Sequence, residues 1–243
     1  MNNKTVELKE LMLRNETSQT ELRQIIRAIE EDFNKNFINL FEILEFLYEK
    51  KNYNKLSPNY LNVYIFCLLK RSTSLELQKA LKKFFPKEFV TSLTSNSYDY
   101  SVLESSLCQG NFFEADQLTQ SLLCKLAGEK SQKRQWLYFT EVKQIKPEKL
   151  KDINLLWDLY SQGKFGIAIQ RKLWFSLNKN WYEFWKEIGW INNLNWLRYP
   201  SEFTWGLEAP RGHLPLFNQL RGVQVLEALF LHAAWEEDSA SRY

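Results

Sequence analysis

Histidine, cysteine and glycine are scarce in this sequence of 243 residues, and each scarcity excludes a class of site. Only His213 and His232 are present, so few proton-transfer or metal constellations can be built on histidine. The sequence contains no Gly-rich dinucleotide or phosphate loop and no G-x-S-x-G nucleophile elbow. We therefore expect a protein that is not an enzyme, with no catalytic residues and no metal site.

The three cysteines, Cys67, Cys108 and Cys124, are odd in number and form no C-x-x-C pair. This pattern indicates neither a disulfide framework nor a zinc site, and it favours a reducing compartment. Long uncharged apolar runs are also missing, because glutamates interrupt the most apolar stretches, such as residues 37–47. With no apolar signal-peptide core at the N-terminus, we expect a protein that is neither secreted nor membrane-spanning.

Charge of one sign is not in excess. The net charge is +3, and acidic and basic residues are interspersed along the chain, so nucleic acid is not an expected partner. Hydrophobic residues make up 44% and charged residues 25%, which is typical of a globular chain with one large or two small domains.

The composition changes along the chain. All nine tryptophans lie between Trp136 and Trp235, and all eight glycines follow residue 109. A Ser/Thr/Asn cluster at residues 91–97 is the expected junction. We predict an all-α protein, with an N-terminal antiparallel helical bundle at residues 1–90 and a second helical domain at residues 98–236.

Capping signals and apolar spacing predict helices throughout the first domain. Ser18 and Thr73 each precede an acidic residue by three positions, as in a capping box, and Ser57 precedes a proline suited to the first helical turn. A helix at about residues 37–48 is apolar on most sides and is expected to be the central one.

The second domain is also predicted to be helical. Gly128 should end one helix and Asn180 should cap a short one, while a further helix should begin near residues 213–215. The charged residues 129–134 and the aromatic residues 190–200 show no helical period. We expect them to form mobile loops beside a cleft.

The aromatic loop contains Trp196, Arg198 and Tyr199, a combination that suits a flat, apolar, anionic ligand. Two simpler interpretations remain open at this point. The tryptophans could build the core, and the arginines could be solvated or ion-paired. His213 could bind a metal, although a histidine in a turn more often hydrogen-bonds that turn.

Five blocks in the second half carry a family resemblance: FEADQLT (113–119), RQWLYFTEV (134–142), INLLWDLYSQGKFGIAIQRKLW (153–174), IGW (188–190) and FTWGLEAPRGHLPLFNQLRGVQV (203–225). They resemble the genomes-uncoupled type family of tetrapyrrole-binding proteins, which stimulate magnesium chelatase in chlorophyll biosynthesis. The resemblance implies a cupped, all-helical domain that binds protoporphyrin IX or Mg-protoporphyrin IX, and it is compatible with a bilin.

The resemblance also implies a partner and a location. The partner is the large porphyrin-binding subunit of magnesium chelatase, and peripheral association with a membrane is compatible with this role. An N-terminal helical domain resembles those of cyanobacterial and algal plastid members, so we expect a plastid-encoded protein or a protein of the cyanobacterial cytoplasm. The alternative function is a helical adaptor that binds protein partners only.

Residues of the family pocket carry over onto matching positions. The arginine that contacts a propionate corresponds to Arg221, and an aromatic pocket-wall residue corresponds to Phe139. Ile188 in the IGW block belongs to the same candidate set. The chain departs from the pattern at Gln224, where the family has a second basic residue, and at Tyr199, where it has tryptophan.

Overall fold

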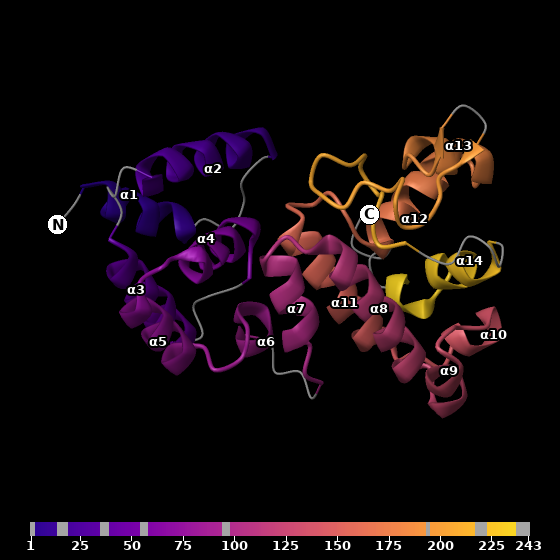
Figure 1. Cartoon of the computed structure of the whole chain (residues 1–243), viewed down its shortest axis with the longest axis horizontal. Coiled ribbons are helices and arrows are strands. Elements are labelled where there is room, and N and C mark those ends of the chain that lie inside the picture. The colour runs from indigo at the N-terminus through magenta and orange to yellow at the C-terminus, as the bar shows by residue number, and fades with distance from the viewer. Residues whose placement is uncertain are drawn as a thin grey trace. The chain divides into compact units, whose positions relative to one another are not determined.

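The computed structural model describes residues 3–13, 19–34, 39–53, 58–93, 98–192, 195–216 and 223–236 (Figure 1). The described chain is mostly helical, which confirms the predicted fold class. It divides into two compact units, Met1–Gln109 and Gly110–Tyr243. This division lies beyond the junction expected at residues 91–97, and the first three of those residues belong to a helix.

The N-terminal unit consists of helices joined by short connections. They are α1 (Asn3–Met12), α2 (Gln19–Asn34), α3 (Leu40–Asn52), α4 (Tyr60–Arg71), α5 (Leu75–Phe84), α6 (Phe89–Leu93) and α7 (Ser101–Cys108). Helix α4 packs against α2, α5 and α6, and most of its residues are buried. Helix α3 buries a single face, so the prediction that residues 37–48 form the central helix is wrong.

Helix starts in this unit differ by one or two residues from the predicted ones. The Asn59 side chain accepts a hydrogen bond from the Asn62 N–H at 2.8 Å and caps α4, whereas Ser57 was predicted to do so. Ser74 accepts from the Leu77 N–H at 3.3 Å and caps α5 in place of Thr73. Only the residue directly before the first turn brings its side chain within reach of these N–H groups. Ser18 and Ser57 lie outside the described residues.

Two cysteines of the N-terminal unit pair. Cys67 on α4 and Cys108 at the end of α7 form a disulfide, and their Cα atoms are 5.4 Å apart. The expectation of no disulfide is therefore wrong, because folding brings together two helices that lie far apart in the sequence. Cys124 is free and buried.

The C-terminal unit contains α8 (Phe112–Leu126), α9 (Glu129–Arg134), α10 (Phe139–Val142), α11 (Pro147–Tyr160), α12 (Ile167–Ser176), α13 (Trp181–Glu187) and α14 (Gln224–Phe230), with a 3₁₀ turn η2 (Ala233–Trp235). Strands β1 (Ile191–Asn192) and β2 (Asn195–Trp196) pair antiparallel. As predicted, the Asn180 side chain caps α13 by accepting hydrogen bonds from the N–H groups of Tyr182 and Glu183.

Three local predictions for this unit are wrong. Residues 129–134 form helix α9 and not a loop, and residues 191–192 and 195–196 pair as strands β1 and β2. Residues 213–216 are not helical, and among the described residues the next helix begins at Gln224. The segment at 213–216 is held by side chains from other helices, which Pro215 alone does not reveal.

Most of the tryptophans build the core of this unit. Trp157, Trp174 and Trp190 are fully buried, and Trp185 and Trp235 are nearly so. The indole N–H of Trp157 donates to the Thr119 hydroxyl at 2.9 Å, which satisfies a polar atom that would otherwise be buried without a partner. The simpler interpretation of the tryptophan content is therefore correct for these side chains.

Candidate functional site

A row of tryptophans runs from α13 into the hairpin. Trp181 and Trp185 lie one helical turn apart and stack with ring centroids 5.1 Å apart. Trp185 also stacks on Trp190 at 5.1 Å and meets the edge of Trp196 at 5.5 Å. Trp196 is 48% exposed, whereas Trp185 and Trp190 are buried. In this tryptophan row, Trp181–Trp185–Trp190–Trp196, the exposed ring of Trp196 therefore packs against the buried ring of Trp185, which is itself stacked between its neighbours.

Tyr199 belongs to a different aromatic cluster. Its ring centroid lies 6.2 Å from that of Phe113 and 6.0 Å from that of Trp205. The side chain is 54% exposed. Burial, followed by the negative charge of Asp116, raises the pKa of the Tyr199 phenol. The structure therefore places Trp196 and Tyr199 against separate partners, although only two residues separate them.

Two other predicted site residues differ in exposure. The Arg198 side chain is exposed, and its backbone N–H donates to the Glu202 carboxylate at 2.7 Å. Ile188 is fully buried, and its carbonyl lies 2.7 Å from Nδ1 of His213. Ile188 therefore supports the site from the core, and its side chain offers no exposed surface to a ligand.

Helix α10 contributes a second exposed aromatic surface. Phe139 is 46% exposed and Tyr138 is 49% exposed. Arg134 lies over the Tyr138 ring, 4.4 Å from its centroid, and pairs with Glu141 at 2.5 Å. These contacts explain why the charged segment forms an ordered helix, α9. Because α10 packs against α14, the structure brings the helix of Phe139 beside the helix that begins at exposed Gln224.

Residues 212–216 lie in the same sequence block as Arg221, and side chains from several elements hold them in place. The Gln170 amide donates to the carbonyls of Gly212 and Pro215 at 2.9 and 2.8 Å. The Leu216 N–H donates to the buried Asp116 carboxylate at 2.7 Å. The indole N–H of Trp190 donates to the His213 carbonyl at 2.8 Å. Through this last bond, the segment is connected to the tryptophan row.

His213 lies within this segment and hydrogen-bonds its surroundings. Its Nδ1–H donates to the Ile188 carbonyl, and Nε2 accepts from the Thr204 N–H at 3.3 Å. Burial lowers the pKa of His213, which favours this neutral form. Both ring nitrogens are occupied, so the turn-bonding interpretation holds over the metal interpretation. The described ranges of the chain contain no cluster of three or more His, Cys, Asp or Glu that could hold a metal.

Arg221, the predicted propionate contact, lies outside the described residues. Sequence reasoning also missed Trp185, which contacts Trp196, Trp190, which stacks on Trp185, and Asp116, which accepts a hydrogen bond from Leu216. The spacing of Trp181 and Trp185, four residues apart on a capped helix, is the signal that could have identified the stacked pair.

The second half of the chain matches a known protein family. The model of the family described as GUN4-like matches residues 93–233. The chain belongs to the GUN4-like family. GUN4-like tetrapyrrole-binding proteins are non-catalytic, which confirms the expectation that the chain is not an enzyme.

Individual relatives agree with this assignment. The chain is 48% identical to "Uncharacterized protein ycf53" of Cyanidium caldarium, over 82% of this chain and 86% of the relative. It is 41% identical to "Tetrapyrrole-binding protein, chloroplastic" of Arabidopsis thaliana, over 56% of this chain and 55% of the relative. The structure of GUN4 from Chlamydomonas reinhardtii matches with a TM-score of 0.55 and 42% identity, covering 59% of this chain and 93% of that one.

The GUN4-like match contains every element of the site. It includes α10, the tryptophan row, the 212–216 segment and α14. Relatives of the chain occur in red algae, in a cyanobacterium and in a chloroplast. No helix in the described part of this GUN4-like chain is long and apolar enough to cross a membrane.

Proposed function

We propose that the C-terminal unit binds a tetrapyrrole and acts as a non-catalytic regulator of magnesium chelatase in chlorophyll biosynthesis. The observation that supports this most is the exposed ring of Trp196, which contacts the buried ring of Trp185, which in turn stacks on buried Trp190. A rigid aromatic surface is suited to the flat, apolar face of a macrocycle, because it loses little conformational entropy on binding.

The ligands that we propose are protoporphyrin IX and Mg-protoporphyrin IX. An open-chain bilin carries the same propionates and is a further candidate. Burial of the ring face should supply most of the affinity, whereas a cation should fix the position of the propionate edge. Arg221 is the proposed cation, and exposed Arg198 is a second, weaker one because solvent screens its charge.

We also propose further residues of the binding site, a protein partner and a cellular location. Phe139, Gln224 and Tyr199 contribute exposed surface from α10, α14 and the loop after the hairpin, while Ile188 supports the site from the core. The partner is the large porphyrin-binding subunit of magnesium chelatase, and association with the membrane is peripheral. The setting is a plastid or the cyanobacterial cytoplasm, in keeping with the relatives.

Titration with protoporphyrin IX while tryptophan emission is recorded tests this proposal. Emission should quench saturably in the parent chain. Trp196→Ala should weaken binding by roughly 30-fold. About half of the Trp196 side-chain surface is free to contact the ligand, and losing that apolar contact costs about 2 kcal/mol of binding free energy.

Tyr182→Ala is the matched control, since Tyr182 on α13 is 44% exposed but lies outside the tryptophan row. It should bind like the parent. An absence of saturable quenching in the parent chain would refute the proposal and favour the adaptor function. Equal affinity in the Trp196→Ala and Tyr182→Ala variants would move the ligand away from the tryptophan row.

A further inference from the structure

The disulfide between Cys67 and Cys108 lies in the N-terminal unit and plays no part in the proposed tetrapyrrole site. It joins α4 to the last residue of α7 across 41 positions of sequence. Its two cysteines are 7% and 3% exposed, so a reducing dithiol reaches a sulfur only when the end of α7 opens locally.

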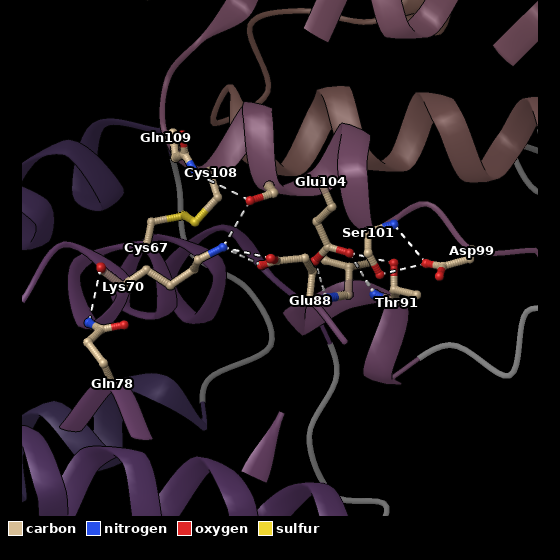
Figure 2. Close-up of polar contacts among 12 residues, drawn as sticks. Cys67, Lys70, Gln78, Glu88, Thr91, Asp99, Ser101, Glu104, Cys108 and Gln109 are labelled. Atoms are coloured by element: carbon tan, nitrogen blue, oxygen red, sulfur yellow. Dashed lines mark hydrogen bonds and ion pairs between the residues drawn. A yellow bond between two sulfur atoms is a disulfide. The ribbon is translucent and has the colours of Figure 1, made fainter. Parts of the chain in front are cut away.

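Polar side chains link the same helices beside the disulfide (Figure 2). Lys70 follows Cys67 by one turn on α4, and its ammonium donates to the hydroxyl of Ser105, which precedes Cys108 by one turn on α7. The same ammonium pairs with the Glu88 carboxylate at 2.7 Å. Exchange at this disulfide therefore takes place beside polar side chains that also link α4 to α7.

Helix α7 has a further attachment that does not depend on the disulfide. Glu104 is fully buried on α7, and its carboxylate accepts hydrogen bonds from the N–H groups of Val90 and Thr91 at the start of α6 and from the Thr91 hydroxyl (Figure 2). Opening the disulfide therefore leaves α7 anchored to α6, while its C-terminal turn loses the covalent connection to α4. Both redox states can keep the fold.

We propose that Cys67 and Cys108 form a reversible thiol–disulfide site, which a protein dithiol reduces and which sets how tightly the end of α7 is held to α4. Relatives occur in a chloroplast and in a cyanobacterium. In compartments where thiols are kept reduced, protein disulfides are usually transient and redox-sensing.

The exchange needs only the dithiol as co-reactant. One thiolate of the dithiol attacks a cysteine sulfur and forms a mixed disulfide, and the other cysteine leaves as a thiolate. The second thiol of the dithiol then attacks the dithiol's first sulfur, which is bonded to the cysteine in the mixed disulfide. This step releases the second cysteine. Two electrons pass to the Cys67–Cys108 pair, the dithiol becomes a disulfide, and its two protons end on the released cysteines.

Thiol counting on the folded, full chain tests the site, with reduced and oxidised dithiothreitol as the probe. The chain is incubated at a series of ratios of reduced to oxidised dithiothreitol, and exchange is quenched in acid. It is then unfolded and alkylated, and its mass is measured by mass spectrometry. We expect one alkylated thiol, Cys124, in oxidising buffer and three in reducing buffer, and a return to one on reoxidation. Three thiols in every buffer, or one thiol at every ratio, would overturn the proposal.

Amide exchange supplies the second measurement, since it reports how tightly α7 is held. Exchange at the end of α7 should rise at least about tenfold on reduction, because a crosslink that restricts opening is lost. Cys124→Ser, the matched control, should show the same response. Cys67→Ser should exchange like the reduced parent in both buffers. Equal exchange in oxidised and reduced parent chains would show that the disulfide does not control α7.

Discussion

The buried carboxylate of Asp116 should make the stability of the C-terminal unit depend on pH. Burial raises the pKa of Asp116 from an ordinary value of 3.8 to about 7, and the hydrogen bond from the Leu216 N–H only partly opposes this. In the unfolded chain the side chain is solvated and returns to its ordinary pKa. The folded state therefore holds a proton that the unfolded state has released at any pH between these two values.

This difference determines the sign of the effect. Between pH 4 and pH 7 the folded state binds more protons, so the Asp116 contribution to the free energy of unfolding falls as pH rises and is level above about pH 7. A shift of roughly three pKa units corresponds to about 4 kcal/mol, at 1.36 kcal/mol per unit, as an upper value. His213, whose pKa burial lowers, has the opposite slope at acid pH, so a variant is needed to isolate Asp116.

Asp116→Asn is that variant, because its amide oxygen can still accept from the Leu216 N–H but the side chain does not ionise. The free energy of unfolding of this variant, relative to that of the parent, should rise by up to about 3 kcal/mol between pH 4.5 and pH 7.5 and should rise no further above that. Urea unfolding measured at pH steps by tryptophan emission and far-UV circular dichroism gives this difference.

Asp99→Asn is the control for this experiment. Hydrogen bonds from Ser101 lower the pKa of Asp99, so its contribution to stability changes only at pH values below 3.8. The difference between Asp99→Asn and the parent should be level from pH 4.5 to pH 8.5. A level difference for Asp116→Asn over the same range would refute the account of Asp116 as a buried carboxylate with a raised pKa.

Two further predictions address the proposed ligand and the backbone. Arg221→Ala should weaken binding of protoporphyrin IX by about 10- to 150-fold, which corresponds to the loss of one hydrogen bond to a charged group. The melting temperature should not change. An affinity equal to that of the parent would exclude Arg221 as the propionate contact. Gly189→Ala should lower the free energy of unfolding by more than Gly110→Ala. Both glycines have positive φ, but a Cβ at Gly189 would lie 2.8 Å from Cγ of Pro210, whereas one at Gly110 meets nothing within 4 Å. Equal losses in urea unfolding would contradict the steric argument.

The sequence by itself determined the features that depend on neighbouring residues. The helical class, the Asn180 cap of α13 and the end of α8 just before Gly128 all follow from capping and spacing within a few positions. The family assignment also rested on sequence, since blocks such as FTWGLEAPRGHLPLFNQLRGVQV match over many consecutive residues.

Only the tertiary structure decided the features that depend on distant residues. Cys67 and Cys108 pair because α4 and α7 meet, and residues 213–216 do not continue as a helix because Asp116 and Gln170 bond their backbone. Ile188 is fully buried and Trp196 exposed for the same reason, although both are large apolar side chains. The exposure of a side chain and its hydrogen bonds to distant residues arise when elements pack. The composition or spacing of one segment does not indicate which other segment packs against it.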